Sequence, residues 1–143
     1  MNMNLKVKYH TDVEPLRQVE GSDWIDLRVA EDIEIKAGQF RLISLGVSVQ
    51  LPPNCEAYVI PRSSTFKNYG LLQTNSFGLI DESYCGDDDI WMFPALATRD
   101  VYIEKNTRIA QFRVNKKMGD VEFEVVDEMG NEIRGGFGST GRK

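Results

Sequence analysis

The sequence predicts a single all-β domain, a sandwich or barrel of short strands, and three observations support that prediction. Apolar and polar residues alternate with the period of a half-buried strand, as at Val47, Val49 and Leu51. Clusters of glycine, proline, asparagine and aspartate interrupt these segments at short intervals, which is typical of β-sandwiches and barrels. No long stretch keeps the apolar period of an amphipathic helix.

The alternation and the turn signals place the individual elements. In the segment 109–114, Ala110 and Phe112 share one face of a strand, and Ile109 and Gln111 share the other. One short helix is expected over residues 63–69, with a serine at its start as the N-cap. The expected strands are residues 33–35, 40–43, 47–51, 57–60, 91–96, 101–103, 109–114 and 121–125.

Length and composition fit one soluble domain. The chain has 143 residues, of which 41% are hydrophobic and 27% charged, as in ordinary globular proteins. A net charge of −5 argues against general nucleic-acid binding, which needs a basic surface. No apolar run approaches the roughly 20 residues of a membrane helix. The first residues have no apolar region typical of a signal peptide, so a cytoplasmic protein is expected.

Histidine and cysteine usage limits the chemistry. His10 is the only histidine, so mechanisms that use a histidine base and His-rich metal sites are disfavoured. Acid–base chemistry should therefore depend on carboxylates. Cys55 and Cys85 form no CxxC motif, and two reduced cysteines are expected.

Two segments carry groups suited to a phosphorylated ligand. Residues 61–64 combine the guanidinium of Arg62 with two hydroxyls at a predicted helix start, which suits phosphate oxygens. The same pattern also fits a simple helix cap. Gln111 on its strand can hydrogen-bond a base or a phosphate, or it can be an ordinary exposed polar residue.

A glycine-bounded turn presents a carboxylate and an aromatic ring. Between Gly78 and Gly86, Asp81 could act as a general base and Tyr84 as an apolar platform beside it. The alternative is a solvated turn without catalytic use. The adjacent aspartates, residues 87–89, point to alternate sides of an extended chain and are interpreted as a charged turn rather than a metal site.

The C-terminal end, RGGFGSTG over residues 134–141, is expected to be mobile because it is rich in glycine. It is not a P-loop, since it lacks the Lys-Ser/Thr pair and the helix that follows one. Its composition suits a flap, because glycine amides approach phosphate oxygens closely and Phe137 can stack on a base. The alternative is a flexible, solubilising terminus.

Taken together, these segments resemble the trimeric deoxyuridine triphosphatase (dUTPase) family. Its five ordered motifs are matched by residues 26–27, 61–64, 75–86, 108–111 and 135–141, and the resemblance covers about residues 20–141. It implies a jelly-roll-like β-barrel that forms a homotrimer with active sites shared between subunits. It also implies a division into a barrel domain, residues 1–133, and a mobile arm, residues 134–143, that covers phosphate and base.

The resemblance implies roles for the residues of the third motif. The main chain of a tight hairpin reads the uracil edge and excludes a 5-methyl group. Tyr84 packs against the deoxyribose and rejects a 2′-hydroxyl, and Asp81 holds the water that attacks the α-phosphorus. The residues implied to read uracil are Asn75, Gly78, Leu79 and Ile80.

The other motifs are implied to serve the triphosphate from neighbouring subunits. Mg²⁺ is held mainly by phosphates and water, with Asp26 in its outer shell. A third subunit supplies the flap that closes over base and phosphates. The phosphate-binding residues are Arg62, Ser63, Ser64 and Gln111, and the flap residues are Phe137, Gly138, Ser139 and Thr140.

The predicted function is hydrolysis of the α–β phosphoanhydride of dUTP to dUMP and pyrophosphate, by Mg-assisted in-line water attack with an Asp general base. One alternative is a dCTP deaminase-related enzyme, but that chemistry needs a glutamate where residues 90–96 are apolar. Another is a dUTP-binding regulatory protein, which should have lost the base or the flap. Two departures from the family pattern have no assigned role: the acidic run of residues 87–89, and Arg134, which directly precedes Gly135.

Overall fold

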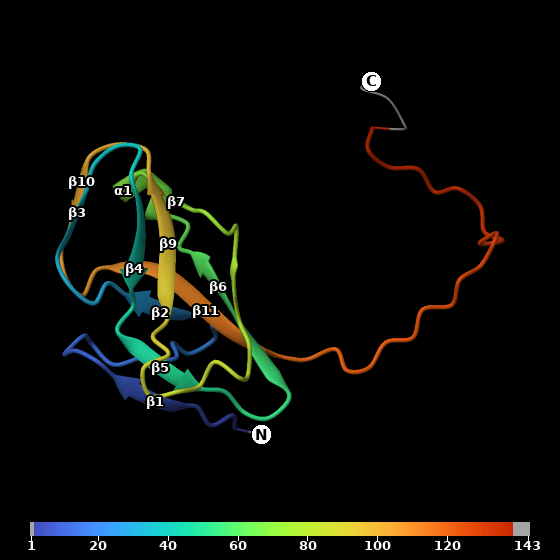
Figure 1. Ribbon diagram of the computed structural model, residues 1–143, viewed down its shortest axis with the longest axis horizontal. Coiled ribbons are helices and arrows are strands. Elements are labelled where there is room, and N and C mark those ends of the chain that lie inside the picture. Colours follow the sequence, from blue (N-terminus) through green and yellow to red (C-terminus); the bar gives the residue numbers. More distant parts are fainter. Residues whose placement is uncertain (1, 139–143) are drawn as a thin grey trace.

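Short antiparallel strands make up almost all of the regular structure in the computed structural model, which describes residues 2–138 (Figure 1). The one helix in this range, α1 (Thr65–Tyr69), is far too short to cross a membrane. The strands are β1 (Lys6–Tyr9), β2 (Ile25–Arg28), β3 (Ile33–Ile35), β4 (Phe40–Ser44), β5 (Val47–Gln50), β6 (Cys55–Pro61), β7 (Leu71–Gln73), β8 (Gly78–Ile80), β9 (Met92–Ala97), β10 (Val101–Ile103) and β11 (Arg108–Lys116).

Two larger sheets and two strand pairs form the body. The larger sheets have the orders β2-β11-β6-β8 and β4-β9-β7, and the pairs are β1-β5 and β3-β10. The ladder between β6 and β11 is the most extensive, with partners from Ala110↔Pro61 to Lys116↔Cys55. This ladder fixes the register on which the candidate site depends.

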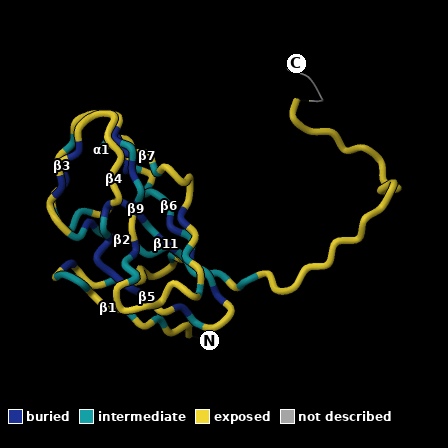
Figure 2. The backbone as a smooth tube through the Cα atoms, in the orientation of Figure 1, coloured by how far each residue is buried: buried dark blue, intermediate teal, exposed yellow. Residues whose placement is uncertain are grey.

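The buried residues lie between the sheets (Figure 2), and most of the core side chains are aliphatic, with three aromatic rings among them. Trp91, Phe93 and Phe112 are completely buried, and the rings of Trp91 and Phe112 meet edge to face with centroids 5.0 Å apart. Alternate residues of β6 and β9 face this core, which explains the alternation read from the sequence.

The all-β prediction is confirmed, and seven of the eight expected strands match β3, β4, β5, β6, β9, β10 and β11 within one or two residues. The sequence prediction misses β1, β2, β7 and β8, because β7 and β8 show no apolar–polar alternation and in β1 and β2 the alternation extends over only four residues. Both Ile109 and Ala110 are buried, since a register shift between Arg108 and Ala110 interrupts the alternation expected there.

The predicted strand at residues 121–125 is wrong for this structure. The segment alternates correctly, but Phe123 is 89% exposed and Val125 is 93% exposed, and no strand of the described range pairs with it. A strand needs a neighbour to satisfy its backbone groups, and periodicity alone does not supply one.

The predicted helix is confirmed but begins at Thr65, two residues later than expected. Ser64 is the N-cap, yet its side chain makes no capping hydrogen bond. The helix ends at Gly70, where a φ of 65° and side-chain atoms of Arg99 and Thr98 only 2.9 Å from an added Cβ require glycine.

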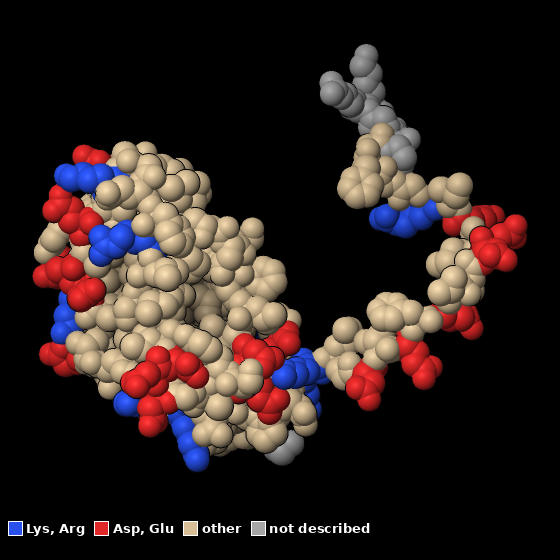
Figure 3. Space-filling view, in the orientation of Figure 1, with Lys and Arg blue, Asp and Glu red and all other residues tan. Residues whose placement is uncertain are grey.

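The chain leaves the body after Lys117, and residues 118–138 are exposed throughout (Figures 1 and 2). This departure lies well before residue 134, and a functional boundary at residue 134 stays a prediction. We call residues 118–138 the arm. It is mainly acidic (Figure 3), with Asp120, Glu122, Glu124, Asp127, Glu128 and Glu132.

Candidate active site

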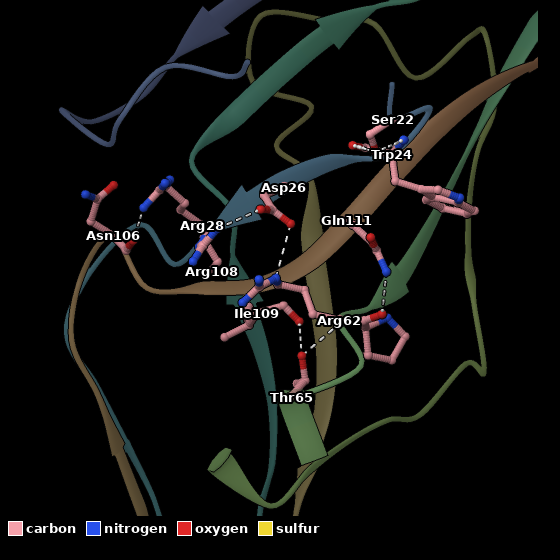
Figure 4. A network of polar contacts seen from close by, with 11 residues as sticks. Ser22, Trp24, Asp26, Arg28, Arg62, Thr65, Asn106, Arg108, Ile109 and Gln111 are labelled. Atoms are coloured by element: carbon pink, nitrogen blue, oxygen red, sulfur yellow. Dashed lines mark hydrogen bonds and ion pairs between the residues drawn. The ribbon is translucent and has the colours of Figure 1, made fainter. Parts of the chain in front are cut away.

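A carboxylate flanked by two guanidiniums forms the first part of the site (Figure 4). Asp26 on β2 accepts from Arg62 Nε through Oδ1 and from Arg108 Nη1 through Oδ2, each at 3.2 Å. All three side chains are partly exposed. Two positive groups around one negative group leave a net positive cluster, which suits an anion.

Backbone register brings these residues together. Gln111 on β11 lies opposite Asp26 on β2 and opposite Ile60 on β6. Its amide donates to the carbonyl of Pro61 at 3.2 Å, so it fastens the end of β6 from which Arg62 emerges. Ser63 is exposed and Ser64 is half-buried, and both directly follow Arg62 in the chain.

Buried Thr65 fixes the turn that carries Arg62. Its hydroxyl donates to the carbonyl of Ile109 at 2.7 Å and accepts from the backbone N–H of Arg62 at 3.0 Å. A buried hydroxyl with both bonds satisfied holds the turn rigidly against β11. No local sequence pattern indicates this role, because a threonine in the first turn of a helix is ordinary and its partner Ile109 lies far away in the chain.

The predicted uracil-reading segment connects two different sheets. A tight turn, with Ser76 at φ 63° and a bond from Phe77 N–H to Asn75 O of 2.7 Å, joins β7 to β8. However, β7 pairs with β9, whereas β8 pairs with β6 and lies at the edge of its sheet. Within residues 2–138 these two strands therefore do not pair with each other, and the segment is an open corner rather than a closed hairpin.

Asp81 follows β8 with a partly exposed carboxylate. Its Oδ2 accepts from the backbone N–H and the hydroxyl of Ser83, at 2.9 and 2.5 Å, and its Oδ1 lies 3.2 Å from Lys117 Nζ. These hydrogen bonds, mainly those from Ser83 and then that from Lys117, hold the pKa of the Asp81 carboxyl well below its usual range. Asp81 is therefore ionised at neutral pH, as a water-binding base must be.

Tyr84 closes the turn that begins at Asp81. Its backbone N–H donates to Asp81 O at 3.0 Å, and its hydroxyl donates to the carbonyl of Ile90 at 2.9 Å. The anchored hydroxyl fixes a ring that stays 39% exposed beside Asp81. This is the position expected of an apolar platform.

The two parts of the site lie at opposite ends of β6. Ile80 pairs with Ala57, so Asp81 lies near the Cys55 end of that strand, whereas Arg62 follows Pro61 at the other end. Six residues of strand separate the two ends by about 20 Å. One chain therefore does not bring the cluster of Asp26, Arg62 and Arg108 close to its own Asp81.

The remaining predicted residues do not join either part. Phe137 and Gly138 are exposed at the far end of the arm, and Ser139 and Thr140 lie outside the described residues. Arg134 is exposed and contacts only its neighbour Gly135 among the bonds described.

The acidic run forms a turn, as predicted. Asp89 accepts from the backbone N–H of Gly86 at 2.8 Å, and the hydroxyl of Ser48 donates to the carbonyl of Asp89 at 2.9 Å. Throughout residues 2–138, no group of three or more Asp, Glu, His or Cys side chains could hold a metal ion.

Comparison with known proteins shows the family of the chain. A family model described as dUTPase matches residues 13–141. The SPbeta prophage-derived deoxyuridine 5′-triphosphate nucleotidohydrolase YosS of Bacillus subtilis is 54% identical over 99% of this chain and 100% of its own length.

Solved structures share the fold. A mutant dUTPase of Staphylococcus bacteriophage 80alpha, determined with dUpNHpp, superposes with a TM-score of 0.78 at 19% identity, covering 97% of this chain and 99% of that one. A mutant dUTPase from phage phi11 of S. aureus, described with a structural Mg(II) ion, gives 0.73 at 15% identity, covering 88% and 98%. The predicted jelly-roll fold is confirmed by these likenesses, and the chain belongs to the dUTPase family of deoxyuridine 5′-triphosphate nucleotidohydrolases.

Proposed function

We propose that this chain hydrolyses dUTP to dUMP and pyrophosphate at a site that two or more copies assemble together. The single observation that carries the proposal is the placement of Arg62 and Asp81 at opposite ends of β6. A triphosphate bound to the Arg62 cluster of one copy meets a water bound to Asp81 only if a second copy supplies that Asp81.

Uracil is read by main-chain groups in the corner between β7 and β8. Because β7 and β8 are edge strands of two different sheets, each has one edge whose backbone donors and acceptors pair with no other strand of residues 2–138 and can bind a base. Backbone N–H and C=O groups at fixed positions can pair with the acceptors and donors on the edge of one base. The proposed uracil contacts are Asn75, Gly78, Leu79 and Ile80, and Tyr84 packs against the deoxyribose.

Asp81 binds the attacking water and accepts its proton. Hydrolysis of a phosphoanhydride needs an in-line water and a group that orients it. The carboxylate is ionised, partly exposed and held from two sides, so it can accept a hydrogen bond from water at neutral pH. No histidine is required for this step.

The triphosphate binds to Arg62, Ser63, Ser64 and Gln111. The guanidinium of Arg62 uses Nε for Asp26, which leaves its outer nitrogens for phosphate oxygens. Asp26 thus orients Arg62, and its negative charge reduces the repulsion between Arg62 and Arg108 when no substrate is bound.

The donor set fits a magnesium ion that the substrate itself carries. Both oxygens of Asp26 already pair with arginines, and the described residues contain no cluster of ligands, so Asp26 reaches an ion only through water. Mg²⁺ supplies neutralisation of the charge that develops on the phosphates.

Assembly as a homotrimer is proposed from two uncovered surfaces. The outer face of the β4-β9-β7 sheet exposes large apolar side chains, including Phe40 at 54% and Leu42 at 60%, and charged residues surround its uncharged centre in Figure 3. The arm likewise exposes Val121, Phe123 and Val125 without a place on its own body. Other copies of the chain would cover both surfaces.

The end of the arm is proposed to close the site, with Phe137 over the base and Gly138, Ser139 and Thr140 around the phosphates. Glycine amides and hydroxyls suit phosphate oxygens. As an enzyme of deoxynucleotide metabolism that supplies dUMP, the chain is expected in the cytoplasm.

The nucleotide specificity tests the reaction directly. With Mg²⁺, the purified protein should release pyrophosphate from dUTP and at least about a hundredfold more slowly from dTTP, dCTP and UTP, because a 5-methyl group, a different base edge and a 2′-hydroxyl each conflict with the proposed contacts of base and sugar. Pyrophosphate and ammonia are measured for each nucleotide. Equal turnover of dTTP, or ammonia from dCTP, would contradict the proposal.

Replacing the base separates binding from chemistry. Asp81→Asn should keep dUTP affinity within a few-fold but reduce kcat by about a hundredfold or more, the usual contribution of a general base. Calorimetry with a non-hydrolysable analogue and steady-state kinetics measure the two effects. The matched control is Asp88→Asn, whose side chain is 94% exposed on the nearby acidic turn. Near-normal turnover of Asp81→Asn would remove Asp81 as the base.

Removing the arm's end tests the flap. A chain that lacks residues 134–143 should remain a trimer in analytical ultracentrifugation, while kcat/KM for dUTP falls by about a hundredfold, because phosphate and base lose their cover. Dissociation of the trimer would show that these residues hold the assembly together instead.

A further inference from the structure

Lys117 lies between two carboxylates at the point where the chain leaves the body. Its Nζ is 3.2 Å from Asp81 Oδ1 and 3.2 Å from Glu82 Oε1, and its side chain is 33% exposed. No sequence motif includes Lys117, and none of the proposed steps of hydrolysis gives this lysine a role.

The lysine is fixed by both its backbone and its second carboxylate. The backbone N–H of Lys117 donates to Asn54 O at 2.9 Å, and the backbone N–H of Asn54 donates to Glu82 Oε2 at 3.0 Å. Asn54 itself stands at φ 61° in the turn between β5 and β6. This closed set of bonds holds Nζ at one place relative to Asp81, which an isolated surface lysine would not achieve.

The contacts leave Asp81 with one free acceptor position. An ionised carboxylate offers about four acceptor positions. Ser83 occupies two on Oδ2 and Lys117 occupies one on Oδ1. The remaining position is on Oδ1, so the attacking water is directed to the oxygen that Lys117 holds.

We propose that Lys117 is a positioning residue for the dUTPase reaction: together with Ser83 it orients the Asp81 carboxylate so that Oδ1 presents a single acceptor position to the attacking water. The inference rests on the proposed role of Asp81 as the base.

The charges around Asp81 are consistent with this role. Among residues 2–138, Lys117 is the one cation paired with Asp81, and the pKa of Lys117 is raised mainly by its bond to Asp81. From β6, the nearest titratable groups are Glu56 and Tyr58, and the Tyr58 hydroxyl donates to Glu56 at 2.6 Å. Removing Lys117 therefore leaves Asp81 without a compensating cation, and its pKa must rise.

The decisive variant is Lys117→Met, with Lys117→Arg as the conservative replacement and Lys116→Met as the control, since exposed Lys116 is the adjacent lysine. For Lys117→Met we expect kcat to fall about tenfold with KM nearly unchanged, because the base loses its orientation. The acidic limb of the kcat/KM profile should move to higher pH. Lys117→Arg should restore most of kcat, and Lys116→Met should behave as the unmodified chain.

A measurement without turnover tests the contact itself. In protein labelled with ¹³C at aspartate carboxyls, the Asp81 signal, assigned from its loss in Asp81→Asn, should titrate at higher pH in Lys117→Met than in the unmodified chain. In the Asp81→Asn background, Lys117→Met should lower the residual rate no further.

The outcomes separate the two claims. If Asp81→Asn turns over normally, the base assignment fails and the positioning role fails with it. If Asp81→Asn is inactive but Lys117→Met leaves kcat, the pH profile and the Asp81 titration unchanged, only the positioning role is overturned.

Discussion

The antiparallel ladder between β6 and β11 is the constraint on which the rest of the structure depends. It runs from Ala110↔Pro61 to Lys116↔Cys55, and the two parts of the site lie near its two ends. Gln111 and Arg62 lie at one end, and Lys117 and the neighbourhood of Asp81 lie at the other. A shift of this ladder by one residue would turn the core residue Phe112 outward. It would also break the contacts at both ends of the ladder.

Because of this arrangement, a single chain does not place Arg62 and Asp81 close enough to act on one substrate. Each end of the ladder is built with satisfied hydrogen bonds: Thr65 holds the turn of Arg62, and Ser83 and Lys117 hold Asp81. The rigid strand between them keeps the ends about 20 Å apart, so no local movement can join them. A net charge of −5 does not conflict with the proposed triphosphate site, because Arg62 and Arg108 are placed together around the single carboxylate of Asp26.

Features that depend on residues close together in the sequence were predictable. Features that depend on contacts between strands far apart in the sequence were not. The alternation at Val47 and Val49 predicted β5, and the glycine-bounded turn drew attention to Asp81 as the proposed base. The pairing of Asp26 with Arg62 and Arg108, and of Asp81 with Lys117, depends on strand register that no local pattern encodes. The segment 121–125 shows the same limit, since its alternation is correct but no strand within residues 2–138 pairs with it.

The assembly of one site from two chains is tested most directly by mixing two inactive variants. Arg62→Ala and Asp81→Asn chains should each lack activity alone. When they are unfolded together in equal amounts and refolded, about a quarter of the sites should combine an intact Arg62 cluster with an intact Asp81, and that share of activity should return. No recovery from mixed trimers, confirmed by mass spectrometry, would show that each site is built within one chain and would contradict this account.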